Sequence, residues 1–74
     1  MKKLEKIELT IQEKTDVINS HIRNLSLNEY NLQLNIIEEQ AKSTPDQNVL
    51  ANYNNQISQI NAQITALNAQ ITAL

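Results

Sequence analysis

The side chains in this sequence that could do chemistry are a few carboxylates, one histidine and two tyrosines. Two groups of glutamates stand close together and could supply carboxylates to a metal site in a helical bundle. They are Glu5, Glu8 and Glu13, and Glu38 and Glu39. Bundle sites of this kind also use a Glu-x-x-His pair, which the chain lacks. We therefore interpret both groups as solvated helix faces and expect no metal.

His21 lies in an apolar stripe and has no cysteine or second histidine to complete a ligand set. It could be a pH-sensitive contact. We favour the alternative interpretation, that it is a histidine at the edge of an interface. Tyr30 and Tyr53 could stack on bases, but they stand in apolar stripes and basic residues are scarce, so we interpret them as core or interface anchors. Without a glycine loop or an activated nucleophile, we expect no enzyme activity, cofactor or small-molecule substrate.

The chain has 74 residues, no cysteine, no glycine and one proline. Chains of this size bury too little surface for a large core and commonly depend on disulfides, a metal or oligomerisation. Since the first two are not available here, we expect oligomerisation. The absence of glycine and the single proline indicate an all-α chain with few turns.

The net charge of −2 is too small to indicate a nucleic-acid or membrane-surface partner. Charges are nearly balanced in residues 1–24, mostly acidic in 25–46 and absent from 47–74. No apolar run reaches the roughly 20 residues of a membrane span, and no signal-peptide core follows Lys2 and Lys3. We expect a protein that is cytoplasmic when made, with neither nucleic-acid nor membrane partners.

Residues 50–74 carry the strongest pattern in the chain, an apolar side chain at every a and d position of a heptad. These positions are Leu50, Tyr53, Ile57, Ile60, Ile64, Leu67, Ile71 and Leu74. This row of residues requires a partner helix. The flanking positions carry amides instead of the charges that usually select a partner, so we expect association through this helix to be nearly independent of salt.

A stripe of alanines on the opposite side of the same helix predicts a second interface. The stripe consists of Ala62, Ala66, Ala69 and Ala73. Small side chains allow a helix to approach closely, and this face has none of the lysines and glutamates typical of a solvated surface. The alternative is that alanine serves only as a good helix former on an exposed face.

The first helix is expected over residues 3–42. Its apolar stripe begins at Leu4. Thr10 and Glu13 could form a capping box that starts the helix later, but the stripe favours the earlier start.

The pattern changes at residues 24–26, where two alternatives are open. Ser26 and Glu29 could form a capping box that restarts a broken helix, or the helix continues, which we favour. Two stripes follow. One continues through Leu25, Leu32 and Ile36, and the other consists of Leu27, Tyr30, Leu34 and Ile37.

Residues 43–46 are the predicted turn, and the second helix is expected over residues 45–74. Thr44 is the predicted N-cap and Pro45 the first helical residue. Because the connection is short, the two helices should fold back as an antiparallel helical hairpin. We expect residues 1–74 to form this single domain, which associates as a coiled coil or a helical bundle.

The antiparallel register predicts which residues meet. We expect Leu27, Tyr30, Leu34 and Ile37 to pack on the heptad row of residues 50–74, forming the main interface. The predicted second interface, which faces a partner, combines the stripe of residues 25–36 on the first helix with the alanine stripe. It consists of Leu25, Leu32, Ile36, Ala62, Ala66, Ala69 and Ala73.

The C-terminal end contains a near-perfect repeat, Ala62-Gln-Ile-Thr-Ala-Leu-Asn68 followed by Ala69-Gln-Ile-Thr-Ala-Leu74. This repeat resembles the amide-rich coiled-coil segments of bacteriophage tail fibres and other virion proteins. The resemblance implies a structural part of a particle, or a small helper that binds one. The Thr44-Pro45 turn departs from the pattern of a simple parallel fibre shaft.

We therefore expect a non-catalytic structural protein that self-associates or docks in a larger assembly, such as a virion. The alternative is a small helical regulator or assembly chaperone that binds a client helix. RNA is a further alternative ligand, which the scarcity of basic residues disfavours. It would give steep salt dependence.

Overall fold

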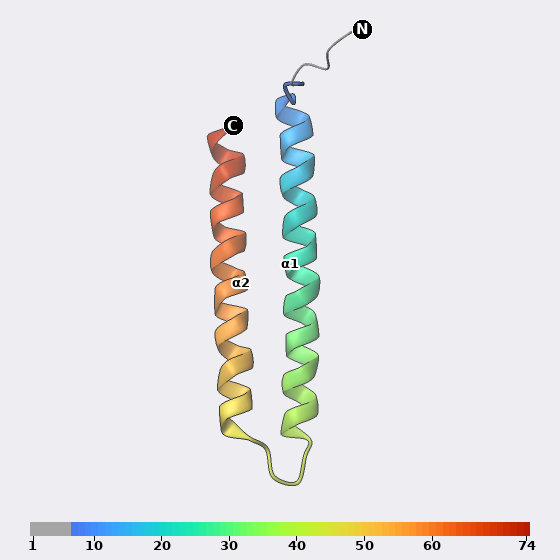
Figure 1. The fold of residues 1–74 in the computed structure, drawn as a ribbon, viewed down its shortest axis with the longest axis vertical. Helices are drawn as coiled ribbons and strands as arrows, with labels where there is room; N and C mark the ends of the chain where they lie inside the picture. The colour runs from blue at the N-terminus through green and yellow to red at the C-terminus, as the bar shows by residue number, and fades with distance from the viewer. Residues whose placement is uncertain (1–6) are drawn as a thin grey trace, which may run out of the picture.

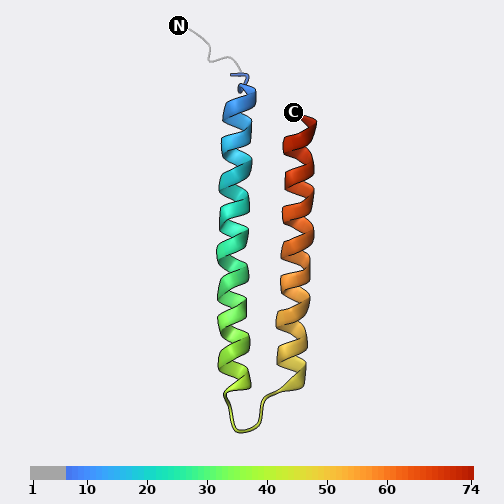
Figure 2. The ribbon, with the colours of Figure 1, turned by 180° about the vertical axis from the view of Figure 1, so that it is seen from behind.

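The computed structural model describes residues 7–74, which form two α-helices joined by a short loop (Figure 1). Helix α1 spans Ile11–Gln40 and helix α2 spans Gln47–Ala73. The two helices lie side by side and antiparallel, and the view from behind shows the same arrangement (Figure 2). The described chain is an all-α helical hairpin, which confirms the predicted fold.

Helix α1 begins at Ile11 because Thr10 and Glu13 form a complete capping box. The Glu13 N–H donates to Thr10 Oγ1 at 3.0 Å, and the Thr10 N–H donates to Glu13 Oε1 at 2.9 Å. These bonds satisfy two N–H groups that have no partner within the helix. Residues 7–10 are not helical, so our prediction of an earlier start is wrong over these residues, and Leu4 lies outside the described range.

Helix α1 continues through residues 24–26 without a break, which confirms the continuous alternative. Ser26 lies exposed on the helix surface and does not begin a new helix. The helix ends at Gln40, and the N–H of Ala41 donates to Ile37 O at 3.0 Å. One helix therefore carries both apolar stripes of the first half of the chain.

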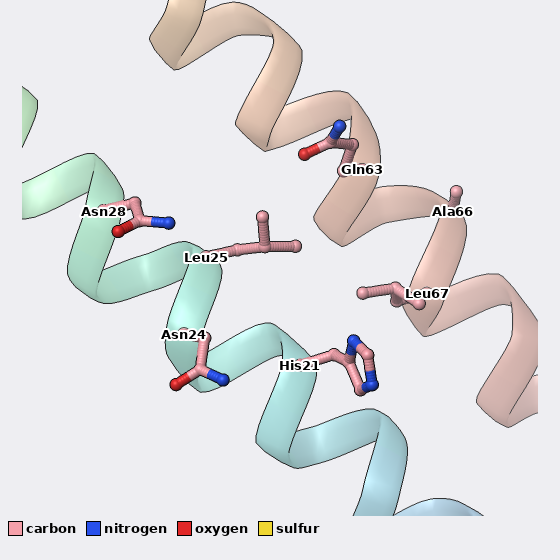
Figure 3. A pocket seen from close by; sticks show the side chains of 7 residues that line it. All are labelled: His21, Asn24, Leu25, Asn28, Gln63, Ala66 and Leu67. Atoms are coloured by element: carbon pink, nitrogen blue, oxygen red, sulfur yellow. The ribbon is translucent and has the colours of Figure 1, made fainter.

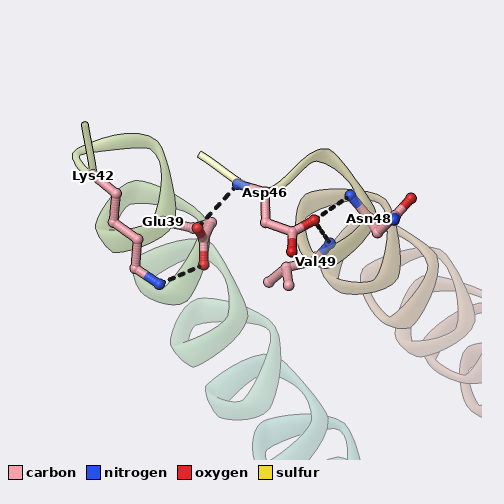
Figure 4. Close-up of polar contacts among 5 residues, drawn as sticks. All are labelled: Glu39, Lys42, Asp46, Asn48 and Val49. Carbon is pink, nitrogen blue, oxygen red and sulfur yellow. Dashed lines mark hydrogen bonds and ion pairs between the residues drawn. The ribbon is translucent and has the colours of Figure 1, made fainter. Parts of the chain in front are cut away.

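The loop of residues 41–46 is held by Glu39, which is only 6% exposed. Glu39 Oε1 accepts a bond from Lys42 Nζ at 3.0 Å, and Oε2 accepts one from the Asp46 N–H at 3.1 Å (Figure 4). The bond from Lys42, followed by that from Asp46, holds the pKa of Glu39 below its ordinary value of 4.5. Our interpretation of Glu39 as part of a solvated face is therefore wrong. Lys42 pairs with Glu39, three positions before it, although the spacing of four would also favour a pair with Glu38.

Helix α2 begins at Gln47 with Asp46 as its N-cap, so the predicted cap at Thr44 and first helical residue at Pro45 are wrong. Asp46 Oδ1 accepts bonds from the N–H groups of Asn48, at 2.9 Å, and Val49, at 3.3 Å. A charged cap also interacts favourably with the positive end of the helix dipole. Because Glu39 fixes the backbone of the same residue, Asp46 is the better cap.

One stripe from each helix forms the contact between α1 and α2. On α2 it is the heptad row of residues 50–74 described above, which we call the α2 seam. Its members are half-buried except for Ile60, which is 9% exposed. On α1 it follows heptad spacing through half-buried and buried positions. They are Thr15, Ile18, Ile22, Leu25, Glu29, Leu32, Ile36 and Glu39. We call these residues the inner stripe.

The inner stripe is not the stripe that we predicted to pack on α2. Leu25, Leu32 and Ile36 belong to it, although we assigned them to a partner, whereas the four residues predicted to face α2 are exposed. Leu27, Tyr30, Leu34 and Ile37 are 51%, 59%, 38% and 59% exposed. The inner stripe runs from Thr15 to Glu39, whereas the other stripe gives way to Arg23 and Ser20 toward the N-terminus. The longer stripe buries more apolar surface against the α2 seam.

We expect Ile60→Ala to lower the free energy of unfolding by about 2–4 kcal/mol, because Ile60 is the most buried apolar side chain of the described residues. The measurement is urea unfolding followed by circular dichroism. Ile11→Ala is the matched control, since Ile11 is 65% exposed and should change the stability by no more than about 0.5 kcal/mol. Equal effects of the two variants would contradict the observed packing.

We expect the stability of the hairpin to fall in acid partly through Glu39. A carboxyl group whose pKa is lowered by folding stabilises the folded state above its unfolded pKa, and that contribution is lost as the pH falls through the lowered value. Glu39→Gln should therefore reduce the loss of unfolding free energy between about pH 6 and pH 3. If the variant and the native chain lose equal stability over this range, the Glu39 contacts do not stabilise the turn.

Candidate interaction surface

The exposed stripe on α1 is the candidate interaction surface of this protein. We call it the outer stripe, and it consists of Leu27, Tyr30, Leu34 and Ile37. Its members are separated by three, four and three positions, which places them on one face of an α-helix. At heptad spacing this face points away from the inner stripe, and hence away from α2. The hairpin therefore presents a row of four large apolar side chains that are 38–59% exposed.

Amides and small polar residues flank the outer stripe, and charges stand only near its ends. Ser26, Asn31 and Gln33 lie beside it and are exposed. Arg23 precedes the stripe by one turn, and Glu38 directly follows its last member. Among residues 7–74, the only ion pair joins Glu39 and Lys42. Arg23 and Glu38 are therefore free to pair with charges on another molecule.

The predicted second interface does not form one continuous surface. Its part on α1 packs inside the hairpin, as described above. The alanines are exposed on α2. Leu25 and Ala66 line the same groove between the helices, but the two groups do not face outward together. Contact of the alanine stripe with a partner stays a prediction.

A groove of about 440 Å³ lies along the contact between the two helices (Figure 3). Leu25 and Leu67 point toward one another across it, from α1 and α2 respectively. The side chain of His21, which is exposed, also lines the groove. His21 thus lies at the edge of a helix contact, but the contact is the one within the hairpin. The groove is otherwise lined by Asn24, Asn28, Gln63 and Ala66.

The described part of the chain offers no assembled metal site. Within residues 7–74, no three carboxylate, histidine or thiol side chains come together as ligands. Of the glutamates considered above, Glu13 caps α1, where the N–H of Thr10 and its hydroxyl lower the pKa of the carboxyl group, and Glu39 holds the loop. Glu5 lies outside the described residues. Glu13 and Glu39 therefore have local structural roles, whereas Glu8 and Glu38 are exposed.

Neither α1 nor α2 is long and apolar enough to cross a membrane.

Two residues with structural roles were missed by the sequence pattern. Glu39 stands seven positions after Leu32, so heptad spacing places it on the inner stripe, a signal that could have identified it. Asp46 is by residue type a better N-cap than Thr44, but the proline that follows Thr44 favoured the earlier start. The bond from the Asp46 N–H to Glu39 decides between them, and it depends on the folded hairpin.

No family model matches this chain, and no curated protein or solved structure matches it either. The resemblance of the C-terminal repeat to virion fibre segments therefore stays a prediction.

Proposed function

We propose that this chain is a non-catalytic assembly protein whose hairpins associate with one another through the outer stripe of α1. The observation that carries this proposal is the exposure of Leu27, Tyr30, Leu34 and Ile37 on one helix face. Single exposed apolar residues are ordinary on protein surfaces, but a continuous row of them marks an interaction site.

The small core of the hairpin supports the same proposal. Among residues 7–74, Ile60 is the only apolar side chain that the hairpin buries. In a two-helix hairpin, each apolar side chain at the contact packs against only one other helix. Full burial of a large apolar side chain contributes roughly 1.5–3 kcal/mol, so covering the half-exposed outer stripe would add roughly 3–6 kcal/mol per copy. Association can therefore supply stability that the lone hairpin lacks.

The surroundings of the outer stripe favour a contact that salt does not weaken. The side chains beside its centre are amides and a serine, and α2 carries no charge from Gln47 onward. Screening by salt acts on charges and leaves apolar contacts in place. A nucleic-acid partner would need a row of basic residues, which this face does not have. These features support a protein partner.

We expect the native chain to have a discrete mass above that of one copy in sedimentation equilibrium, at low and at high salt. The double variant Tyr30→Gln with Leu34→Gln should remain helical and should associate at least about tenfold more weakly, because it removes the centre of the apolar contact. Glutamine is a good helix former, so the helix itself should persist.

Val17→Gln is the matched control for this experiment. Val17 is 50% exposed on the same helix but does not belong to the outer stripe, so its replacement should leave the mass unchanged. A double variant that keeps the native mass would overturn the proposed surface. A native chain that stays monomeric over the whole concentration range would overturn self-association.

A further inference from the structure

We infer that the outer stripe is covered by α1 of a second copy of this chain, packed antiparallel about a two-fold axis between Tyr30 and Leu34. This inference rests on the proposed self-association and specifies its orientation and its contacts. A two-fold contact is the commonest way in which identical chains associate. In such a contact, every pair of different residues that meet occurs twice, once on each side of the axis.

The spacing of the outer stripe is self-complementary. Intervals of three, four and three positions read the same in both directions along the helix. An antiparallel copy therefore brings Leu27 opposite Ile37 of the second copy and Tyr30 opposite Leu34 of the second copy. In antiparallel heptad packing, the a positions of one helix face the d positions of the other, as these pairs do. Every layer in this arrangement joins two large apolar side chains.

The residues beside the axis can face their own copies without repulsion. Asn31 flanks the stripe on one side and Gln33 on the other, and both are exposed. At the two-fold axis, each of them lies close to the same residue of the second copy. An amide carries both donors and an acceptor, so it can bond to an identical group. A charged residue at either position would meet its own charge.

The charges near the two ends of the stripe select the antiparallel orientation. Reversal of the second copy brings Arg23 opposite Ala41 of that copy, one helical turn from its Glu38. Ala41 is small and leaves room for the arginine side chain. Parallel packing would place Arg23 beside Arg23 of the second copy, because this residue is in line with the outer stripe. Opposite charges in contact favour one arrangement and like charges disfavour the other.

The size of the contact agrees with a reversible dimer. Residues 23–41 of the two copies overlap, a length of about 27 Å at 1.5 Å per residue. Specific interfaces start at roughly 600 Å² per partner, about a tenth of the 6201 Å² surface of the chain. A single helix pair lies at this lower end, and we expect a dissociation constant in roughly the micromolar range.

A charge-reversal series tests the orientation. Arg23→Glu and Glu38→Arg should each weaken the dimer about tenfold, because each creates two like-charge contacts, and the double variant should restore native affinity. Both residues are exposed and have no ion pair in the hairpin, so the variants should fold. Lys14→Glu makes a similar charge reversal outside the overlap and should leave the affinity unchanged.

Oxidative cross-linking tests the position of the axis. The chain contains no cysteine, so a single introduced thiol reports on one position. Asn31→Cys should form a disulfide-linked dimer under mild oxidation, because the two copies of this position lie close together. Gln59→Cys places the thiol on α2, where it is exposed and lies outside the contact. It should cross-link far more slowly.

The outcomes separate this inference from the proposed function. Restored affinity in the double charge variant together with rapid cross-linking at position 31 supports the antiparallel dimer. An oligomer that shows neither result overturns the antiparallel contact while leaving self-association intact. A chain that is monomeric at every concentration overturns both.

Discussion

The packing of the inner stripe of α1 on the α2 seam is the contact on which the rest of this structure depends. A helix that carries two apolar stripes on opposite faces can turn only one of them toward a single neighbour. The stripe that matches the length of the α2 seam is buried, because it removes more apolar surface from water. The outer stripe is therefore exposed as a direct consequence of the fold.

The turn at residues 41–46 maintains this choice of stripe. Glu39 occupies the last position of the inner stripe and holds both Lys42 and the backbone of Asp46. A buried carboxylate is costly unless hydrogen bonds satisfy it, and here two bonds do so. One side chain thus ends the helix contact, closes the loop and fixes the residue that caps α2. Rotation of α1 toward its other stripe would carry Glu39 away from these partners.

Local sequence features predicted the hairpin, the α2 seam and the continuity of α1. Repeated spacing indicated the helices and the seam, and the short connection that contains Pro45 indicated the turn. Periodicity could not decide which of the two stripes of α1 packs on α2, because both have heptad spacing. The outcome depends on the total apolar area buried. Helix α1 begins at the Thr10 capping box and not where the apolar pattern begins. Ile7 is 81% exposed, so burial of its side chain does not favour an earlier start. The cap of α2 depended on Glu39, a contact across the loop.

The distribution of charge assigns different parts to the two helices in the proposed dimer. Helix α2 is uncharged and carries amides on both sides of its seam, so charge cannot select a partner or an orientation for it. Every charge available for selection within the two helices lies on α1. Because the hairpin uses α2 to cover the inner stripe, the proposed dimer would use α2 as the scaffold and α1 as the helix that recognises the second copy. Selectivity then depends on Arg23 and Glu38, while the outer stripe supplies the affinity.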